Sequence, residues 1–191
     1  MPRPAMDVIR KRDLIDAAIA EIGQLGSLDV TVSQIARKAG VSSALAHHYF
    51  GSKERIFLAA MRHVLNVFAE EVRALRAAAH TPRGRAAAIV RACFSDLNFQ
   101  PQVISAWLNF YVLAQTSPEG ARLLRVYQNR LITNLTHELR PLAGPQALDI
   151  AQGVAAMIDG LYIRQALRSS GPDGPASVDL IDRYIDQALA Q

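Results

Sequence analysis

Residues 31–53 read TVSQIARKAGVSSALAHHYFGSK, and this stretch decides the fold of the N-terminal part of the chain. Thr31 can cap a short helix, and Gln34, three residues later, completes a capping box. Gly40 is expected to end that helix in the left-handed conformation, because glycine has no Cβ to clash there. A second short helix follows at once, so the stretch predicts a helix-turn-helix.

This second helix, expected over 43–49 with Ser42 as its N-cap, has a small and polar surface. Ala44 and Ala46 would leave its backbone open to close approach, while hydroxyl and imidazole groups suit base edges in the major groove of DNA. Lys53 begins the next helix, where its ammonium group is placed to bind a phosphate. The predicted DNA-binding residues are Thr31, Ser42, Ser43, Ala44, Leu45 (as an inner anchor), His47, His48, Tyr49 and Lys53.

The positive charge of the chain is concentrated in its N-terminal third, around this motif. The chain has 191 residues and a net charge of +4, and residues 1–63 hold nine Lys or Arg against six Asp or Glu. Most of the positive excess therefore accompanies the helix-turn-helix, as expected of a DNA-binding head on a nearly neutral body. The spacing alone also allows a helical corner in an ordinary all-α domain, with His47 and His48 in solvent.

The whole chain is expected to be all-α, with about nine helices, because no segment alternates like a strand. A basic N-terminal arm carries Arg3, Arg10, Lys11 and Arg12 and runs into the first helix. Prolines at helix starts mark several of the later boundaries. The expected helices are Asp7–Leu25, the two of the motif, Ser52–Ala79, and then 82–99, 101–116, 118–140, 145–169 and 177–190.

Two domains are expected. Residues 1–53 would form the three-helix DNA-binding domain, and residues 54–191 a larger helical domain for ligand binding and dimerisation. The long fourth helix, over 53–79, would link them.

The last two helices are suited to pairing with a second copy. Val154, Ile158, Leu161 and Ile163 lie among small residues, and the final helix has its own apolar stripe of Val178, Ile181, Ile185 and Leu189. A twofold dimer through these faces would present two recognition helices to a palindromic operator. The alternative is that both stripes face the core of their own protomer.

Aromatic side chains in the second half of the chain could enclose a small cation. Aromatic faces attract desolvated cations such as quaternary ammonium groups, and a nearby carboxylate could neutralise them. The predicted ligand-binding residues are Trp107, Phe110, Tyr111, Tyr127, Asp159 and Tyr162, although aromatic residues at helical spacing are often simply core.

The run from Asp13 to Met61, with Thr31, Gly40, Tyr49 and Lys53 in place, resembles the N-terminal domain of the tetracycline-repressor (TetR) family. This resemblance implies that Tyr49 and Lys53 clamp phosphates and that Ser43, Ala44, Leu45 and His47 lie near base edges. The segments IRKRDLIDAAIAEI, SAWLNFYV, NRLITNL and AAMIDGLYIRQAL are similar to the choline-responsive BetI subgroup of betaine-synthesis repressors. The subgroup resemblance implies choline as the effector.

The predicted function is therefore a dimeric, effector-responsive repressor, with double-stranded DNA and a choline-like molecule as partners. Two alternatives remain: a TetR-type repressor that senses another apolar or cationic ligand, as in efflux regulation, and a helical adaptor that binds no DNA.

An enzyme is not expected, since catalytic motifs are missing from the sequence, and neither a cofactor nor a metal is expected. Cys93 is interpreted as a packing residue. With no apolar run long enough for a bilayer, we expect a cytoplasmic protein without membrane contact.

Overall fold

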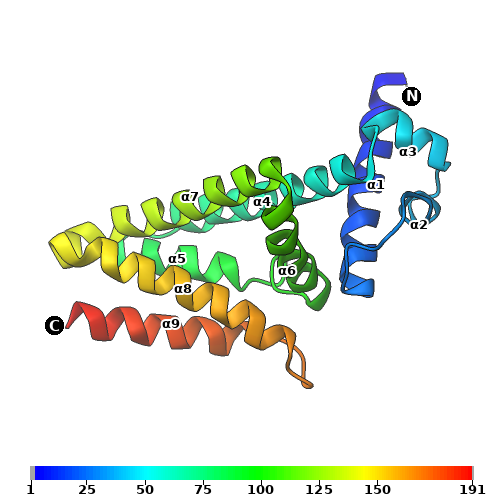
Figure 1. The fold of residues 1–191 in the computed structure, drawn as a ribbon. Coiled ribbons are helices and arrows are strands. Elements are labelled where there is room, and N and C mark those ends of the chain that lie inside the picture. Colours follow the sequence, from blue (N-terminus) through cyan, green and yellow to red (C-terminus); the bar gives the residue numbers. More distant parts are fainter. Residues whose placement is uncertain (1–2, 191) are drawn as a thin grey trace. The chain divides into compact units, whose positions relative to one another are not determined.

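In a computed structural model, residues 3–190 are described, with side chains from residue 6 onward (Figure 1). The regular secondary structure of this part of the chain is entirely helical, with no strand, so the all-α prediction is confirmed. Among the described residues, no helix combines the length and apolar character needed to cross a membrane. The elements in chain order are α1 (Arg3–Leu25), α2 (Val32–Lys38), α3 (Ser43–Phe50), α4 (Lys53–Ala77), α5 (Pro82–Cys93), α6 (Pro101–Thr116), α7 (Pro118–Ala143), the short 3₁₀ helix η1 (Gly144–Gln146), α8 (Ala147–Ala166) and α9 (Gly174–Leu189).

The chain forms two compact units, and each is described here by itself. Unit 1 comprises the chain up to Val64 together with Gln102–Ala121, so it contains α1–α3, the first half of α4, and most of α6. Unit 2 comprises Leu65–Pro101 and the chain from Arg122 onward. The division predicted at residues 53 and 54 remains a prediction.

Apolar side chains from α1 to α4 fill the core of the helix-turn-helix region. Leu14, Ala18 and Ile22 of α1 are fully buried, as are Ile35 of α2 and Ile56 of α4. Ile15 and Ile19 recur with Ala18 and Ile22 at helical spacing, but both are only half-buried, and Leu14 contributes more to this core.

Helices α1 and α6 come very close within unit 1. A Cβ built on Gly23 of α1 would lie 2.6 Å from the backbone oxygen of Gln102 and 2.8 Å from its Cα. Only glycine fits at this position without moving the backbone of α6. Unit 1 is further tied together where Ser117 donates a hydrogen bond of 2.8 Å to Glu54 of α4, and where Arg62 pairs with Glu119.

In unit 2, the carboxylate of Glu138 joins three helices. It is 1% exposed and pairs with Arg76 of α4 and, at 2.6 Å, with Arg85 of α5. Burial by itself raises the pKa of Glu138, but hydrogen bonds and charge interactions with the two arginines outweigh burial and lower that pKa.

Several predicted helix boundaries were wrong. The first helix begins at Arg3, so the predicted basic arm is helical from there on, with Arg10, Lys11 and Arg12 exposed on α1; the side chain of Arg3 lies outside the described residues. Helix α5 ends at Cys93 rather than at residue 99. The buried Asn98 amide donates to the carbonyl oxygen of Ala92 and to Glu71, which favours a compact turn after α5 over a longer helix.

The C-terminal boundaries also differ. A 3₁₀ turn precedes α8, which ends at Ala166 and is shorter at both ends than the expected 145–169. Helix α9 starts at Gly174 instead of 177, because Asp173 caps it by accepting from the Ala176 amide at 2.9 Å.

The apolar stripes predicted for dimerisation are mostly buried within their own protomer. Val154 and Ile158 of α8, and Ile181 and Ile185 of α9, are at most 1% exposed. That part of the prediction was wrong, because these side chains fill the core of their own protomer and are not available to a second copy. The apolar side chains that α8 and α9 do expose are Leu148, Ile163 and Leu180, with Leu167 just beyond α8.

The contact at Gly23 yields a stability prediction. Gly23→Ala should lower the free energy of unfolding by about 1 to 3 kcal/mol, because the new methyl group overpacks backbone atoms that cannot move independently. The matched control is Gly120→Ala in the same unit, where the nearest atom to a Cβ lies at an ordinary 3.4 Å. This control should be neutral, or stabilising by up to about 1 kcal/mol through helix propensity. Urea unfolding of both variants measures the difference, and equal values would contradict the close approach of α1 and α6.

The lowered pKa of Glu138 makes the folding stability depend on pH in the acid range. A carboxyl group whose folded pKa is depressed contributes stability above its unfolded pKa, about 4.3, and that contribution is lost as the pH falls through the folded pKa. The wild-type protein should therefore lose stability progressively below about pH 4.3. Glu138→Gln should be less stable at neutral pH and should lose less on acidification. Unfolding midpoints measured from pH 7 to pH 3 test this, and parallel curves for the two proteins would refute it.

Candidate nucleic-acid interface

Helix α2 is fixed at its N-terminus by the predicted capping box. The Thr31 hydroxyl oxygen accepts from the Gln34 amide at 3.2 Å, and the Gln34 side-chain oxygen accepts from the Thr31 amide at 2.7 Å. Two backbone N–H groups that a helix start leaves unpaired are thus satisfied.

The corner between α2 and α3 depends on Gly40. Its φ angle is +67°, a conformation that side chains with a Cβ rarely adopt. The Gly40 amide donates to the Arg37 carbonyl at 3.2 Å and the Val41 amide to the Ala36 carbonyl at 2.9 Å. This hydrogen-bond pair is a Schellman motif, so the predicted glycine stop is confirmed and the chain leaves α2 in a fixed direction.

Helix α3 presents the predicted surface with one correction. Ser42 caps it by accepting from the Leu45 amide at 3.2 Å, and Ala44, His47 and His48 are exposed. Ala46, however, is fully buried, so it belongs to the core and cannot be part of a surface that a partner approaches.

The side chains of α3 are also held from outside the helix. Leu45 is half-buried, as expected of an inner anchor. Ser43 is half-buried as well, and its hydroxyl shares a hydrogen bond of 3.3 Å with that of Ser33 in α2. At the other end of the helix, His47 Nδ1 lies 3.4 Å from the Gly51 carbonyl oxygen. The exposed surface of α3 is therefore anchored to both of its neighbours in the chain.

Tyr49 is held by the first helix. Its hydroxyl donates to Asp7 Oδ1 at 2.7 Å, and Lys11 Nζ lies 5.5 Å from its ring centroid. The hydrogen bond to Asp7 raises the pKa of Tyr49, and the neighbouring Arg10 opposes this. The sequence reading missed this role of Asp7, Arg10 and Lys11, although their i, i+3, i+4 spacing places them on one face of a helix.

Lys53, the second predicted phosphate contact, is exposed at the first turn of α4. Its ammonium donates to the Leu28 carbonyl oxygen at 3.1 Å and lies 5.6 Å from the ring centroid of Phe57. These two contacts hold the Lys53 ammonium group close to the surface of unit 1. Because an ammonium group has three N–H donors, Lys53 can donate to a phosphate while it keeps the Leu28 carbonyl.

The predicted ligand-binding residues fall in both units. In unit 1, Trp107 and Phe110 are buried and Tyr111 is half-buried, and the Trp107 ring lies 6.4 and 6.2 Å from the rings of Phe110 and Tyr111. The structure therefore brings these three aromatic rings together on α6.

The other three predicted ligand residues belong to unit 2. The half-buried Tyr127 contacts Phe68 edge-on, and Asp159 is half-buried. Tyr162 is buried against Phe94 and Phe99, and its hydroxyl donates to the Cys93 carbonyl oxygen. The Cys93 side chain is buried too, and burial raises the pKa of its thiol.

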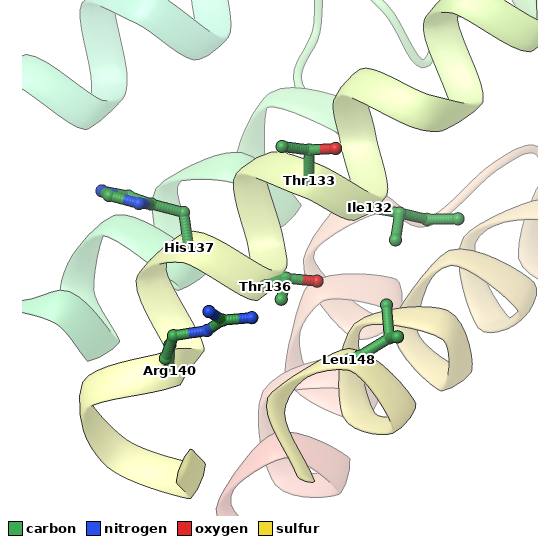
Figure 2. Close-up of a pocket in the computed structure, with 6 residues that line it drawn as sticks. All are labelled: Ile132, Thr133, Thr136, His137, Arg140 and Leu148. Atoms are coloured by element: carbon green, nitrogen blue, oxygen red, sulfur yellow. The ribbon is translucent and has the colours of Figure 1, made fainter. Parts of the chain in front are cut away.

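A cavity of about 330 Å³ lies on unit 2 between the C-terminal half of α7 and the start of α8 (Figure 2). None of the predicted ligand-binding residues lines it; the lining consists of Ile132, Thr133, Thr136, His137, Arg140 and Leu148. Within the described part of the chain, no cluster of three or more His, Cys, Asp or Glu side chains could hold a metal ion.

A capped helix-turn-helix whose second helix is exposed is typical of DNA-binding regulators. Comparisons with known proteins agree. Residues 14–60 match the family described as bacterial regulatory proteins, tetR family, and residues 82–190 match the family described as BetI-type transcriptional repressor, C-terminal. The chain belongs to the TetR family of transcriptional regulators, in its BetI-type branch.

Curated relatives match over nearly the whole chain. The HTH-type transcriptional regulator BetI of Brucella anthropi is 50% identical over 97% of this chain and 96% of its own. The protein of the same name from Rhizobium meliloti is 48% identical over 99% of this chain and 94% of its own. These relatives are transcriptional regulators, and the chain is a regulator rather than an enzyme.

Solved structures share the fold at lower identity. A transcriptional regulator from Rhodococcus sp. Rha1 has a TM-score of 0.83 and 22% identity, covering 94% of this chain and 96% of its own. A regulator from Saccharomonospora viridis, solved in complex with choline, has a TM-score of 0.82 and 22% identity, covering 92% of this chain and 95% of its own.

The phosphate role of Lys53 can be measured directly. Lys53→Ala should weaken binding to all duplexes to a similar degree and should reduce the slope of log affinity against log salt by about 1. The matched control is Arg125→Ala, which removes an exposed positive charge from unit 2. Fluorescence anisotropy with duplex DNA at several salt concentrations provides the readout, and an unchanged slope for Lys53→Ala would rule out the phosphate contact.

Proposed function

We propose that this BetI-type repressor binds a palindromic operator as a homodimer and is released from it by choline or a related quaternary ammonium compound. The exposed surface of α3 supports the DNA-binding part of the proposal. Its exposed Ala44, His47 and His48 lie between firmly capped helix ends, so the surface can enter a major groove without first being ordered.

The proposed phosphate contacts flank this surface along the chain. Tyr49 lies in the last turn of α3, the proposed recognition helix, and Lys53 opens α4. The family resemblance implies a phosphate contact for both residues. Ser42 uses its hydroxyl oxygen as a cap, and its exposed position leaves the hydroxyl proton for a phosphate oxygen. The exposed Thr31 hydroxyl donates to Gln34 Oε1 at 2.7 Å and would exchange this acceptor for a phosphate oxygen. Phosphate contacts would set the orientation of the head, while Ser43, Ala44 and His47 would read bases.

For dimerisation, we propose a twofold interface through the outer faces of α8 and α9. The exposed Leu148, Ile163 and Leu180 supply apolar area on these helices. A twofold axis would place the same surface on both sides of the interface and would match the symmetry of a palindromic site.

For the effector, the aromatic group of Trp107, Phe110 and Tyr111 supports a quaternary ammonium. Aromatic faces attract such a cation by about 0.5 to 2 kcal/mol each when it is desolvated. Tyr127, Asp159 and Tyr162 belong to unit 2, and the ligand role predicted for them from the sequence, with Asp159 as the negative charge, stays a prediction. The branch to which the chain belongs, and the choline complex of the Saccharomonospora viridis protein with the same fold, favour choline as the first compound to test.

The packing of α6 suggests how such a ligand would act on the head. Helix α6 carries the three aromatic residues, touches α1 at Gly23, and leads into the ion pair and hydrogen bond with α4. A ligand that draws α6 to a new position must therefore move helices of the DNA-binding head. To favour release strongly, the ligand must bind the release state better by several kcal/mol.

The proposal is tested by a gel shift with duplex DNA from upstream of the protein's own gene, with increasing choline. We expect a retarded complex containing two protomers, or a multiple of two, that disappears as choline is added. Binding that ignores choline would remove choline as effector and would leave a repressor of another ligand. The lack of any retarded complex would argue against this operator.

Substitutions in the aromatic group should shift the choline response. Trp107→Phe keeps most of the buried volume but weakens the aromatic face, and Tyr111→Leu removes a half-buried ring. Each should raise the choline concentration for half-release by about 2- to 30-fold, the equivalent of 0.5 to 2 kcal/mol. The matched control is the neighbouring, exposed Val112→Ala, which should leave the response unchanged. If both aromatic variants respond like the control, the effector does not bind at α6.

A further inference from the structure

Helix α1 places the carboxylate of Asp7 against Tyr49, a side chain that is proposed to bind DNA. The Tyr49 hydroxyl is predicted to donate to a phosphate, yet in the DNA-free protein it donates to Asp7 at 2.7 Å. Tyrosine has only one O–H to give, so it cannot serve Asp7 and a phosphate as donor at the same time.

The hydrogen bond between Tyr49 and Asp7 is charge-assisted and partly shielded from water. Hydrogen bonds to an ionised carboxylate are about twice as strong as neutral ones. Both residues are half-buried, and the hydrogen bond to Asp7 raises the pKa of Tyr49. The carboxylate therefore competes effectively for the proton that a phosphate would need.

The charges around Asp7 offer it other partners once Tyr49 leaves. Arg10 and Lys11 follow Asp7 at i+3 and i+4, which places all three side chains on one face of α1. Arg10 also interacts with Tyr49, and Lys11 lies over the tyrosine ring. A negative charge thus sits inside a basic surface, where it opposes the approach of a phosphate backbone.

We propose that Asp7 is an intrinsic brake on DNA binding: its carboxylate holds the Tyr49 hydroxyl in the free protein and must give it up to a phosphate on the operator. On release, Asp7 pairs with Arg10 or Lys11 on its own helix. The brake weakens the DNA complex at every sequence, because the contact that it opposes is to the backbone. This inference rests on the proposed DNA-binding function.

Asp7→Asn is the decisive variant. Asparagine keeps an oxygen that accepts from Tyr49, so the position of the ring is preserved, but it removes the charge. Affinity for operator and for unrelated duplexes should rise by about three- to tenfold, because the competing hydrogen bond weakens and the repulsion of phosphate disappears. The matched control is Asp13→Asn, which removes an exposed carboxylate from another face of the same helix and should have a smaller effect.

A double-mutant cycle with Tyr49→Phe separates the brake from simple charge repulsion. If Asp7 acts through the hydroxyl, Asp7→Asn should gain clearly less affinity in the Tyr49→Phe background than in the wild type. An equal gain in both backgrounds would overturn the brake and leave only repulsion. No gain would also overturn the brake, and a loss would show in addition that the carboxylate orients Tyr49 for DNA.

Two further readouts complete the experiment. Thermal unfolding of each variant confirms that affinities are compared between folded proteins. If the wild-type protein and Asp7→Asn both lack affinity for duplex DNA at low salt, the proposed function itself fails and the brake fails with it. If the wild type binds and Asp7→Asn binds no better, only the brake fails.

Discussion

The left-handed backbone at Gly40 is the constraint on which the DNA-binding surface depends. With φ at +67° and two hydrogen bonds back into α2, it fixes the direction in which α3 leaves the corner. The capping hydroxyls of Thr31 and Ser42 then define where each helix begins. Because the turn and both helix starts are set locally, the surface of α3 is ordered before any partner arrives, and less entropy is lost on binding.

Backbones pack closely in both units, at Gly23 in unit 1 and at Gly174 in unit 2. Unit 1 depends on close contact of backbones, shown by Gly23 against Gln102, and on the fully buried Ala46. Unit 2 also contains a buried charge cluster, in which Glu138 joins Arg76 of α4 and Arg85 of α5. A buried carboxylate with two partners is costly to break, so it favours one particular arrangement of three helices over others with similar apolar burial.

The sequence predicted best what neighbouring residues determine. The capping box, the glycine stop and the exposed histidines of α3 all follow from residues a few positions apart, and each is present. Sequence reasoning failed where the partner is distant. Asp7 meets Tyr49 across 42 positions, and the end of α5 depends on the buried Asn98. The stripes of α8 and α9 were misassigned because an apolar face looks the same in sequence whether it covers its own core or a second copy.

Helix α1 is in contact at both of its ends, with Tyr49 near its start and with Gln102 near its finish. Asp7 and Gly23 are 16 residues apart, which corresponds to about 24 Å along the axis and a fixed rotation about it. Adding or deleting one residue between them would turn one end by about 100° relative to the other. Natural variation in this helix should therefore proceed by replacement, and insertions or deletions should be confined to the turn that follows Leu25 or to the residues before Asp7.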